Sequence, residues 1–348
     1  MVKIGFIGND KVFEKWASKT YLFKINKIKK DKKFNYYKFD DIKKSDMNDE
    51  IMKNDILIFG WNMTYISKFY TFKHKFYKKK INDLESSDVI KHHLEPLLKH
   101  KKKYLVLQDS HNLDYDGGIL NLIEYLNNHY FYGIITPYFF AEGIQLIKRY
   151  RFNLKYPLIH KLKFIHLPHH IDERIFKNYH LDKKYDVFLF GNTSKNHYPF
   201  RNRLKLLLEE MNENKEIKLL HWKIGVGKNY FKYNEKISNK NLSTAINQSQ
   251  LTICTKLKHN FLVGKYFETS LSNSVICGDM TKDGKKIWKN NYIHIDDDMT
   301  NKEIKEIILD ALKDKERLKK IKMYNKEKMK EFYLSKFSNH LFNLIYNK

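Results

Sequence analysis

The sequence of 348 residues is poor in cysteine, proline and glycine, with 2, 5 and 13 residues of these types. The two cysteines, Cys254 and Cys277, are too few for a disulfide framework or a cysteine-based zinc site, so we expect a reducing compartment. No stretch reaches the ~18 uncharged apolar residues that a membrane span needs. The first residues lead directly into a strand pattern without an apolar signal region. We therefore expect a soluble, intracellular (cytoplasmic) protein.

Arginine is scarce as well. Basic residues number 66 and acidic residues 40, for a net charge of +26, and only six of the basic residues are arginine. Surfaces that recognise phosphate and guanine favour arginine, because its planar guanidinium binds them through two hydrogen bonds. The chain is also rich in Asn, Ile, Tyr and Phe, which is typical of an AT-rich genome. We favour this genome bias as the source of the charge and keep a polyanion-binding surface as the alternative.

The chain does contain the material for a large hydrophobic core. Hydrophobic residues make up 42% of the sequence and aromatic residues 15%, which excludes a disordered polyelectrolyte. Short apolar runs alternate with longer helical patterns, as in parallel α/β proteins. The predicted strands of the first half are 3–7, 55–60, 103–108, 133–137 and 163–167. Those of the second half are 185–190, 217–222, 250–255, 274–278 and 292–295, with helices at 198–211, 242–248, 264–271, 301–312 and 314–332.

This pattern restarts near 170–184 and predicts two successive open α/β domains, 1–170 and 171–348. Open parallel sheets bind ligands at the carboxyl ends of their strands, so we expect the site in a cleft between the two domains. The last helix, about 330–348, is expected to pack back on the N-terminal domain.

Several motifs are excluded or weak. Gly5 and Gly8 lie in and at the end of the first strand, but the third glycine of a dinucleotide fingerprint is missing. The pairs His92-His93 and His169-His170 lack the spacing of a metal site, and surface or hinge histidines are the better interpretation. Asp296-Asp297-Asp298 resembles a cation-binding Asp-x-Asp, but it precedes a predicted helix, where carboxylates are common capping residues.

The most informative stretch is 260–276. Gly264 and Lys265 open a predicted helix, Glu268 follows one turn later, and a buried strand comes after small polar residues. Free N–H groups at a helix start, together with a lysine, suit a diphosphate. Glu268 offers a carboxylate that accepts two hydrogen bonds from a ribose diol. The alternative is an ordinary strand-helix junction with a capping glutamate.

This stretch resembles the nucleotide-sugar motif of group 1 glycosyltransferases of the GT-B fold, above all those related to spore-coat glycosyltransferases. Residues 168–172 resemble the Pro-His-Gly-Val-Asp-like crossover of that superfamily, and 185–192 resembles the first strand of its donor domain. The resemblance covers most of 165–345. It departs at Asn260, where members with a Glu-x7-Glu motif have a glutamate, and at Ser272-Asn273-Ser274, which replaces a glycine-rich turn.

A narrower resemblance links the chain to phage DNA β-glucosyltransferases. These enzymes have a similar length. They share a motif in which an Asn-Phe run is followed by a basic residue, an aromatic residue and Glu-Thr. They also have an Asp directly after a strand of the acceptor domain. Asp109 stands at that position, which implies a role as catalytic base, and His111 and Asp114 in the same loop are alternatives. This resemblance and the +26 charge keep DNA as an alternative acceptor.

The resemblance implies two Rossmann-like domains facing across a cleft, and a transferase that moves a hexose from a nucleoside-diphosphate sugar, UDP-hexose above all, to a glycan or glycoconjugate. It implies no cofactor and no catalytic metal, because basic side chains and helix dipoles stabilise the leaving diphosphate. A non-catalytic nucleic-acid-binding protein is the third hypothesis. The predicted donor-binding residues are Gly191, Asn192, Lys195, Arg201, Arg203, Gly264, Lys265, Glu268 and Thr269.

Overall fold

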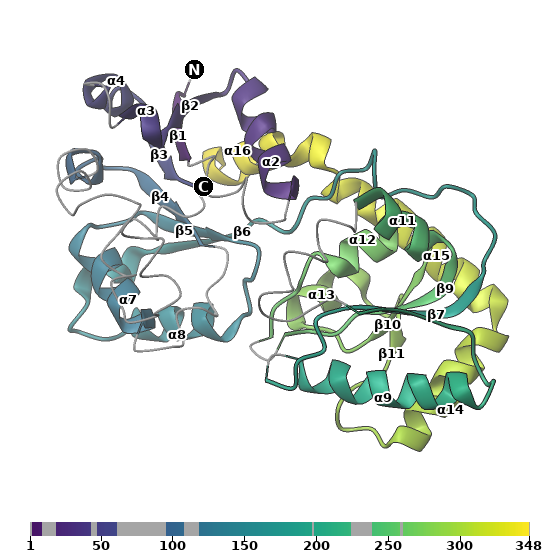
Figure 1. Ribbon diagram of the computed structural model, residues 1–348. Helices are drawn as coiled ribbons and strands as arrows, with labels where there is room; N and C mark the ends of the chain where they lie inside the picture. The colour runs from purple at the N-terminus through teal and green to yellow at the C-terminus, as the bar shows by residue number, and fades with distance from the viewer. Residues whose placement is uncertain are drawn as a thin grey trace. The chain divides into compact units, whose positions relative to one another are not determined.

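The structure, a computed structural model, describes residues 2–8, 19–42, 47–60, 95–107, 118–196, 198–223, 239–257 and 260–347. The chain divides into two units (Figure 1). Unit 1 comprises Met1–Pro168 with Ser338–Lys348, and unit 2 comprises His169–Phe337. Within the described ranges, no helix is long and apolar enough to cross a bilayer.

In its described part, unit 1 contains a sheet of parallel strands in the order β2-β1-β3-β4-β5-β6. Every residue of β1, β3, β4 and β5 is buried, as expected for parallel strands covered on both faces. This explains why short apolar runs identified these strands in the sequence. The strand bounds are Ile4–Gly8, Phe34–Lys38, Ile56–Phe59, Lys103–Val106, Gly133–Thr136 and Lys163–His166.

Strand β2 was not predicted. It pairs with β1 at the edge of the sheet, and of its five residues only Phe34 and Tyr37 are buried. An edge strand with partly exposed Asn35, Tyr36 and Lys38 shows no continuous apolar run. The sequence therefore carried a weak signal for it.

The helices of unit 1 surround a core of aliphatic and aromatic side chains from the sheet and helices. The C-terminal helix α16, Phe337–Tyr346, belongs largely to this unit. The Phe342 ring packs edge-on against Phe34 at 6.3 Å, and the Lys33 ammonium donates to Asn339 Oδ1 at 2.5 Å. The other helices are α2 (Lys19–Lys30), α3 (Phe39–Ile42), α4 (Asn48–Met52), α7 (Gly118–Asn128), α8 (Glu142–Tyr150) and the 3-10 helix η4 (Pro157–Lys161).

Unit 2 contains a second parallel sheet, in the order β11-β10-β9-β7-β8. Alternate residues of β7 point to opposite faces, so Val187 and Leu189 pack with one helical layer while Phe188 and Phe190 pack with the other. Figure 1 shows α9 and α14 on the first face and α11, α12 and α13 on the second. The strand bounds are β7 Tyr185–Gly191, β8 Leu219–Lys223, β9 Ser249–Ile253, β10 Val275–Gly278 and β11 Ile293–His294.

The helices of unit 2 agree with the predicted ones within a few residues. The exception is α13, Lys282–Trp288, which was not predicted. The others are α9 (Pro199–Glu213), α11 (Asn239–Asn247), α12 (Lys265–Leu271), α14 (Asn301–Lys313) and α15 (Lys315–Met329). The predicted α/β class with two parallel sheets is thus confirmed. The roles of the two halves as acceptor and donor domains stay predictions.

Candidate functional site

The candidate site lies at the carboxyl ends of β7 and β9 in unit 2. From β7 the chain moves to β8 on one side of the sheet, and β9 then pairs with β7 on the other side. Where the strand order reverses in this way, the connections leave the sheet in opposite directions and leave room for a ligand. The residues that end these two strands are therefore the first candidates for binding.

Gly191, the last residue of β7, provides that room. Its backbone has φ +97°, a conformation that favours glycine. A Cβ atom at this position would lie 2.9 Å from Lys265 Nζ and 3.0 Å from Arg201 Nη1. Both the backbone and the space therefore require glycine, and two cationic groups approach the same strand end.

Arg201 lies in the first turn of α9 and is only 2% exposed. Its Nε donates to Thr255 Oγ1 at 2.9 Å and its Nη2 to Thr255 O at 3.0 Å, while Nη1 donates to Asn192 O at 3.0 Å. The guanidinium also lies over the Tyr198 ring, 3.9 Å from its centroid. Arg201 thus joins the segments that follow β7 and β9, which is the point where the strand order reverses.

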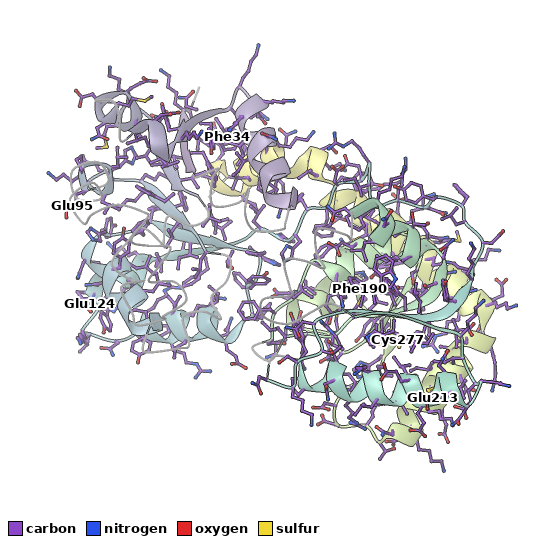
Figure 2. All side chains as sticks on the ribbon, viewed as in Figure 1. Phe34, Glu95, Glu124, Phe190, Glu213 and Cys277 are labelled. Carbon is purple, nitrogen blue, oxygen red and sulfur yellow. The ribbon has the colours of Figure 1, made fainter. Side chains whose placement is uncertain are left out.

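Lys265, the first residue of α12, supplies the second cation. It is buried, its ammonium donates to Phe190 O, and the same ammonium lies 3.9 Å from the centroid of the Phe190 ring (Phe190 is labelled in Figure 2). Burial lowers the pKa of Lys265 well below its usual value, and the nearby Arg201 charge lowers it further. A buried ammonium of this kind is stabilised by any anion that binds beside it.

The two cations share one property that suggests a ligand. Within the described part of the chain, Arg201 and Lys265 make their hydrogen bonds to carbonyl and hydroxyl oxygens, which are neutral. Buried charges are normally paired, because desolvating an unpaired charge is costly. Within the described residues, the Glu268 carboxylate lies close enough to Lys265 for the two charges to interact, but it makes no hydrogen bond to either cation. Two buried cations with neutral hydrogen-bond partners fit a group with several negative charges, such as a diphosphate.

Helix α12 itself adds little to this charge. It has seven residues, Lys265–Leu271, so its dipole is that of two turns. The expectation that its N-terminus binds the diphosphate therefore depends mainly on the Lys265 side chain.

Glu268 lies one turn into α12. A Cβ at Gly264 would be 3.8 Å from Glu268 Oε1, so the carboxylate lies alongside the start of the helix. Burial raises the pKa of Glu268 to about 7, and the Lys265 charge opposes this shift. The side chain is partly exposed, and its carboxylate accepts no hydrogen bond from any described residue. It is therefore available to a ligand.

Replacing Glu268 with glutamine is expected to stabilise the free protein at alkaline pH. Because the pKa is about 7 in the folded state and 4.5 in the reference state, the unfolded state ionises first as the pH rises, and the wild type loses stability between these values. Glutamine has the same shape and does not titrate. The free energy of unfolding of the glutamine variant should equal that of the wild type below this pH range and exceed it increasingly within the range. Above the range the difference should reach about 1–3 kcal/mol.

Chemical unfolding of both proteins at about pH 5 and about pH 8 measures this difference, because each pKa unit is worth about 1.4 kcal/mol. An equal difference at the two pH values would show that Glu268 does not carry a raised pKa.

The other predicted donor-binding residues are placed differently. Thr269 is buried and its Oγ1 lies 3.4 Å from Cys254 Sγ, on the core side of α12. Arg203 donates to Asn301 Oδ1 at 2.8 Å and to Asp297 O at 2.9 Å, so it holds the segment before α14. Lys195 is exposed in the turn after β7. The structure therefore brings Gly191, Asn192, Arg201, Gly264, Lys265 and Glu268 together. It directs Arg203 and Thr269 elsewhere and leaves Lys195 exposed, three residues after Asn192.

Two residues of the site were not predicted. Thr255 follows β9 and accepts two hydrogen bonds from Arg201, and Tyr198 stacks on the same guanidinium. The carboxyl-end rule for parallel strands was the available signal for Thr255, because it closes the predicted strand 250–255. Tyr198 has no signal in the sequence beyond its position before α9.

Asp109, His111 and Asp114 lie outside the described residues, as does the pair His92-His93. The described segment that precedes Asp109 ends at Leu107, one residue beyond β4. There the Leu107 N–H donates to Ile135 O at 2.9 Å.

The sequence elements that suggested a metal have other contacts. His169 and His170 are buried, so the surface alternative is wrong for this pair, while the hinge alternative stays a prediction for a pair that begins unit 2. His170 packs edge-on against Phe332 and Phe337. Asp297 pairs with Arg203 at 3.5 Å, and Asp296 lies 3.0 Å from His294 Nε2. In the described part of the chain, no group of three or more His, Cys, Asp or Glu side chains forms a candidate metal site.

Comparison with known proteins gives structural matches only. No protein-family model matches the sequence, and no curated protein matches it. Anabaena HepE, solved in complex with UDP and glucose, superimposes with a TM-score of 0.56 at 9% identity over 100% of both chains. TarM matches with a TM-score of 0.50 at 12% identity over 83% of this chain, which spans only 54% of TarM. The N-terminal domain of Candida albicans trehalose-6-phosphate phosphatase matches at 0.50 and 9% identity over 99% of this chain and 96% of that one.

These similarities confirm the GT-B fold of two Rossmann-like domains. At such low identity they show the fold and not the activity, since one fold supports several functions. The narrower resemblance to phage DNA β-glucosyltransferases stays a prediction.

Proposed function

We propose that this protein is a glycosyltransferase that transfers a hexose from a UDP-sugar. The observation that carries the proposal is the pair of buried cations, Arg201 and Lys265, which meet beside Gly191 and have neutral hydrogen-bond partners within the described residues. A sugar diphosphate carries two negative charges and gains another when the glycosidic bond breaks. Fixed cations at that position stabilise the transition state more than the ground state.

Each residue of the site has a role in this proposal. Lys265 and Arg201 bind the diphosphate and neutralise it as it leaves, and Gly191 leaves the space for it. The Glu268 carboxylate accepts hydrogen bonds from the ribose hydroxyls. Because two side chains supply the positive charge, we propose that the transfer needs no catalytic metal and no cofactor.

Uridine is supported by comparison. The resemblance of residues 260–276 to the nucleotide-sugar motif points to a nucleoside-diphosphate sugar, and HepE, which has the same fold, was solved with UDP and with UDP-glucose. For the acceptor we propose a glycan or glycoconjugate, which is the acceptor class that the broader resemblance implies. Modified DNA is the second candidate, supported by the net charge of +26.

UDP is expected to raise the unfolding temperature of the protein. A ligand at about 100 times its Kd stabilises the folded state by ~2.7 kcal/mol, which corresponds to about 5–10 °C for a domain of this size. Arg201→Lys should remove most of this shift, since lysine cannot hold Thr255 and Asn192 together. Arg203→Lys, two residues away on α9, is the matched control and should retain it.

A panel of UDP-sugars with glycan acceptors, and separately with hydroxymethylated DNA, then identifies the reaction. Transfer to a glycan confirms the proposed acceptor, and transfer to DNA alone replaces it with the second candidate. A protein that UDP does not stabilise, and that transfers no sugar, contradicts the proposed function.

A further inference from the structure

Unit 1 exposes large apolar side chains on one segment. Phe152 is 84% exposed and Leu154 87%, far above other large hydrophobic residues of the described chain. Leu158 and Tyr130 are also exposed. The remaining exposed ones, Leu206, Met323 and Tyr346, lie one each on α9, α15 and α16. Exposed apolar residues that gather in one place mark an interaction surface more often than scattered ones do.

Two of these four residues, Tyr130 and Leu158, line the same cavity, and Phe152 and Leu154 precede Leu158 by six and four residues. Tyr130, Pro157, Leu158 and Lys161 line one cavity of about 440 Å³, and the Leu158 N–H donates to Asn127 Oδ1 at 2.9 Å. Leu154 precedes Leu158 by four residues, so their Cα atoms are at most about 15 Å apart. We call residues 149–161 with Tyr130 the 149–161 surface.

The backbone of the exposed loop is firmly held. Phe152 N donates to Arg149 O, Asn153 N to Tyr150 O, and Tyr156 N to Asn153 O at 2.9 Å. The side chains of Tyr156 and Ile159, which follow the loop in sequence, are buried in the core of unit 1 and fix the end of the loop. Phe152 and Leu154 are therefore presented to solvent by a hydrogen-bonded turn.

The same segment is strongly basic. No acidic residue occurs between Glu142 and Asp172. The basic residues of this stretch are Lys148, Arg149, Arg151, Lys155, Lys161 and Lys163. Arg149, Lys155 and Lys161 are exposed, and Arg151 donates to His160 O at 2.9 Å beside η4. The apolar loop tip is therefore surrounded by positive charge.

A second, larger cavity adjoins the surface at Tyr130. It has a volume of about 720 Å³, and its lining includes the four lysines 99 and 101–103, with Glu95 (labelled in Figure 2) as its one carboxylate. Lys103 donates to His100 O at 3.0 Å and to Tyr130 O at 3.1 Å, and burial lowers its pKa to about 8. An anion in this cavity would stabilise the charged form of Lys103.

We propose that the 149–161 surface docks on the face of an anionic lipid bilayer. Phe152, Leu154 and Leu158 enter the boundary between headgroups and acyl chains, while the lysines around them and in the cavity at Tyr130 contact headgroup phosphates. Apolar side chains within a basic surface are typical of proteins that lie on membranes without spanning them.

Other occupants fit the surface less well. Single-stranded nucleic acid stacks its bases on aromatic rings, but Leu154 and Leu158 have no ring. A second copy of the chain would bring two strongly positive surfaces together, which is repulsive. A protein partner normally needs about 800 Å² on each side, more than a loop tip of two side chains provides.

Co-sedimentation with vesicles tests the proposal. The protein is expected to bind vesicles of equimolar phosphatidylglycerol and phosphatidylcholine and to remain in solution with phosphatidylcholine alone. Phe152→Ser with Leu154→Ser should weaken this binding by about tenfold or more. The variant no longer gains the free energy of transferring two large apolar side chains from water into the bilayer. Both side chains are exposed, so the unfolding temperature should not fall. Leu206→Ser with Met323→Ser is the matched control and should bind like the wild type.

The charge contribution has its own pair of variants. Lys155→Gln with Lys161→Gln should weaken binding about 30-fold, since each lysine near an anionic surface contributes ~1 kcal/mol. Lys302→Gln with Lys313→Gln, exposed on α14, should have no comparable effect. The proposal is overturned if anionic vesicles do not bind the wild type. It is equally overturned if each control pair weakens binding as much as the test pair that it matches. It is also overturned if the loop variants lose affinity for a single-stranded oligonucleotide but retain it for vesicles.

Discussion

Replacing Glu268 with alanine is expected to weaken UDP binding about 10- to 150-fold while the protein stays folded. The carboxylate is partly exposed and accepts no hydrogen bond from any residue of the described chain, so it is free to accept the two ribose hydroxyls. Hydrogen bonds to a charged acceptor are worth ~1.5–3 kcal/mol, and this range converts to the stated loss of affinity.

Calorimetric titration with UDP measures the effect. Glu306→Ala, which removes an exposed carboxylate on α14, is the matched control and should leave the affinity unchanged. Glu268→Ala should not lower the unfolding temperature at about pH 8, because the side chain is ionised there against the penalty of burial. Equal UDP affinities in the folded variant and the wild type would remove Glu268 from the site.

The pair Arg201 and Arg203 shows what the sequence could not decide. Both were predicted to bind the donor, because both lie in the helix that the resemblance places after the first strand of the donor domain. Residues two apart on a helix are rotated by about 200°, so only one of them can face a given neighbour. The structure directs Arg201 to Thr255 and Arg203 to the segment before α14. The choice depends on how α9 is rotated on the sheet, which the local sequence did not specify.

Gly191 and Lys265 could be predicted more fully, because their positions follow from topology. Each lies where a parallel strand or its following helix meets the carboxyl edge of the sheet, and that edge is visible in the alternation of apolar runs. The approach of Lys265 to Arg201 could not be predicted, since 63 residues separate them in the chain. Only the pairing of β7 with β9 brings them together.

The replaced glycine-rich turn at Ser272-Asn273-Ser274 has a backbone explanation. Asn273 has φ +59°, the left-handed conformation that commonly follows a helix. Asparagine tolerates this conformation better than most residues other than glycine. Its carbonyl accepts a hydrogen bond from Lys183 Nζ at 2.6 Å, which ties the turn to the segment before β7. The departure from the resemblance therefore preserves the turn.

Replacing Asp109 with asparagine is expected to lower turnover about 10²- to 10⁴-fold, the contribution of a general base. Inverting transfer needs a group that takes the proton of the acceptor hydroxyl as the sugar migrates. Asp109 comes three residues after β4, whose carboxyl end lies at the edge where parallel sheets present functional groups. It also matches the Asp that the resemblance to phage DNA β-glucosyltransferases assigns as base. Asparagine keeps the shape of the side chain and removes the basic oxygen.

UDP affinity separates a loss of the base from a loss of structure. In our proposal the donor is bound by residues of unit 2, whereas Asp109 belongs to unit 1, so Asp109→Asn should bind UDP like the wild type. A lowered kcat with unchanged UDP affinity and unchanged unfolding temperature supports the role of base. Asp114→Asn is the matched control, with the same chemistry five residues further along the chain, and should retain most of the turnover. Asp109 is not the base if Asp109→Asn turns over within a few-fold of the wild type. If Asp114→Asn or His111→Ala then loses turnover instead, the base is that neighbour, because the reaction still requires a proton acceptor.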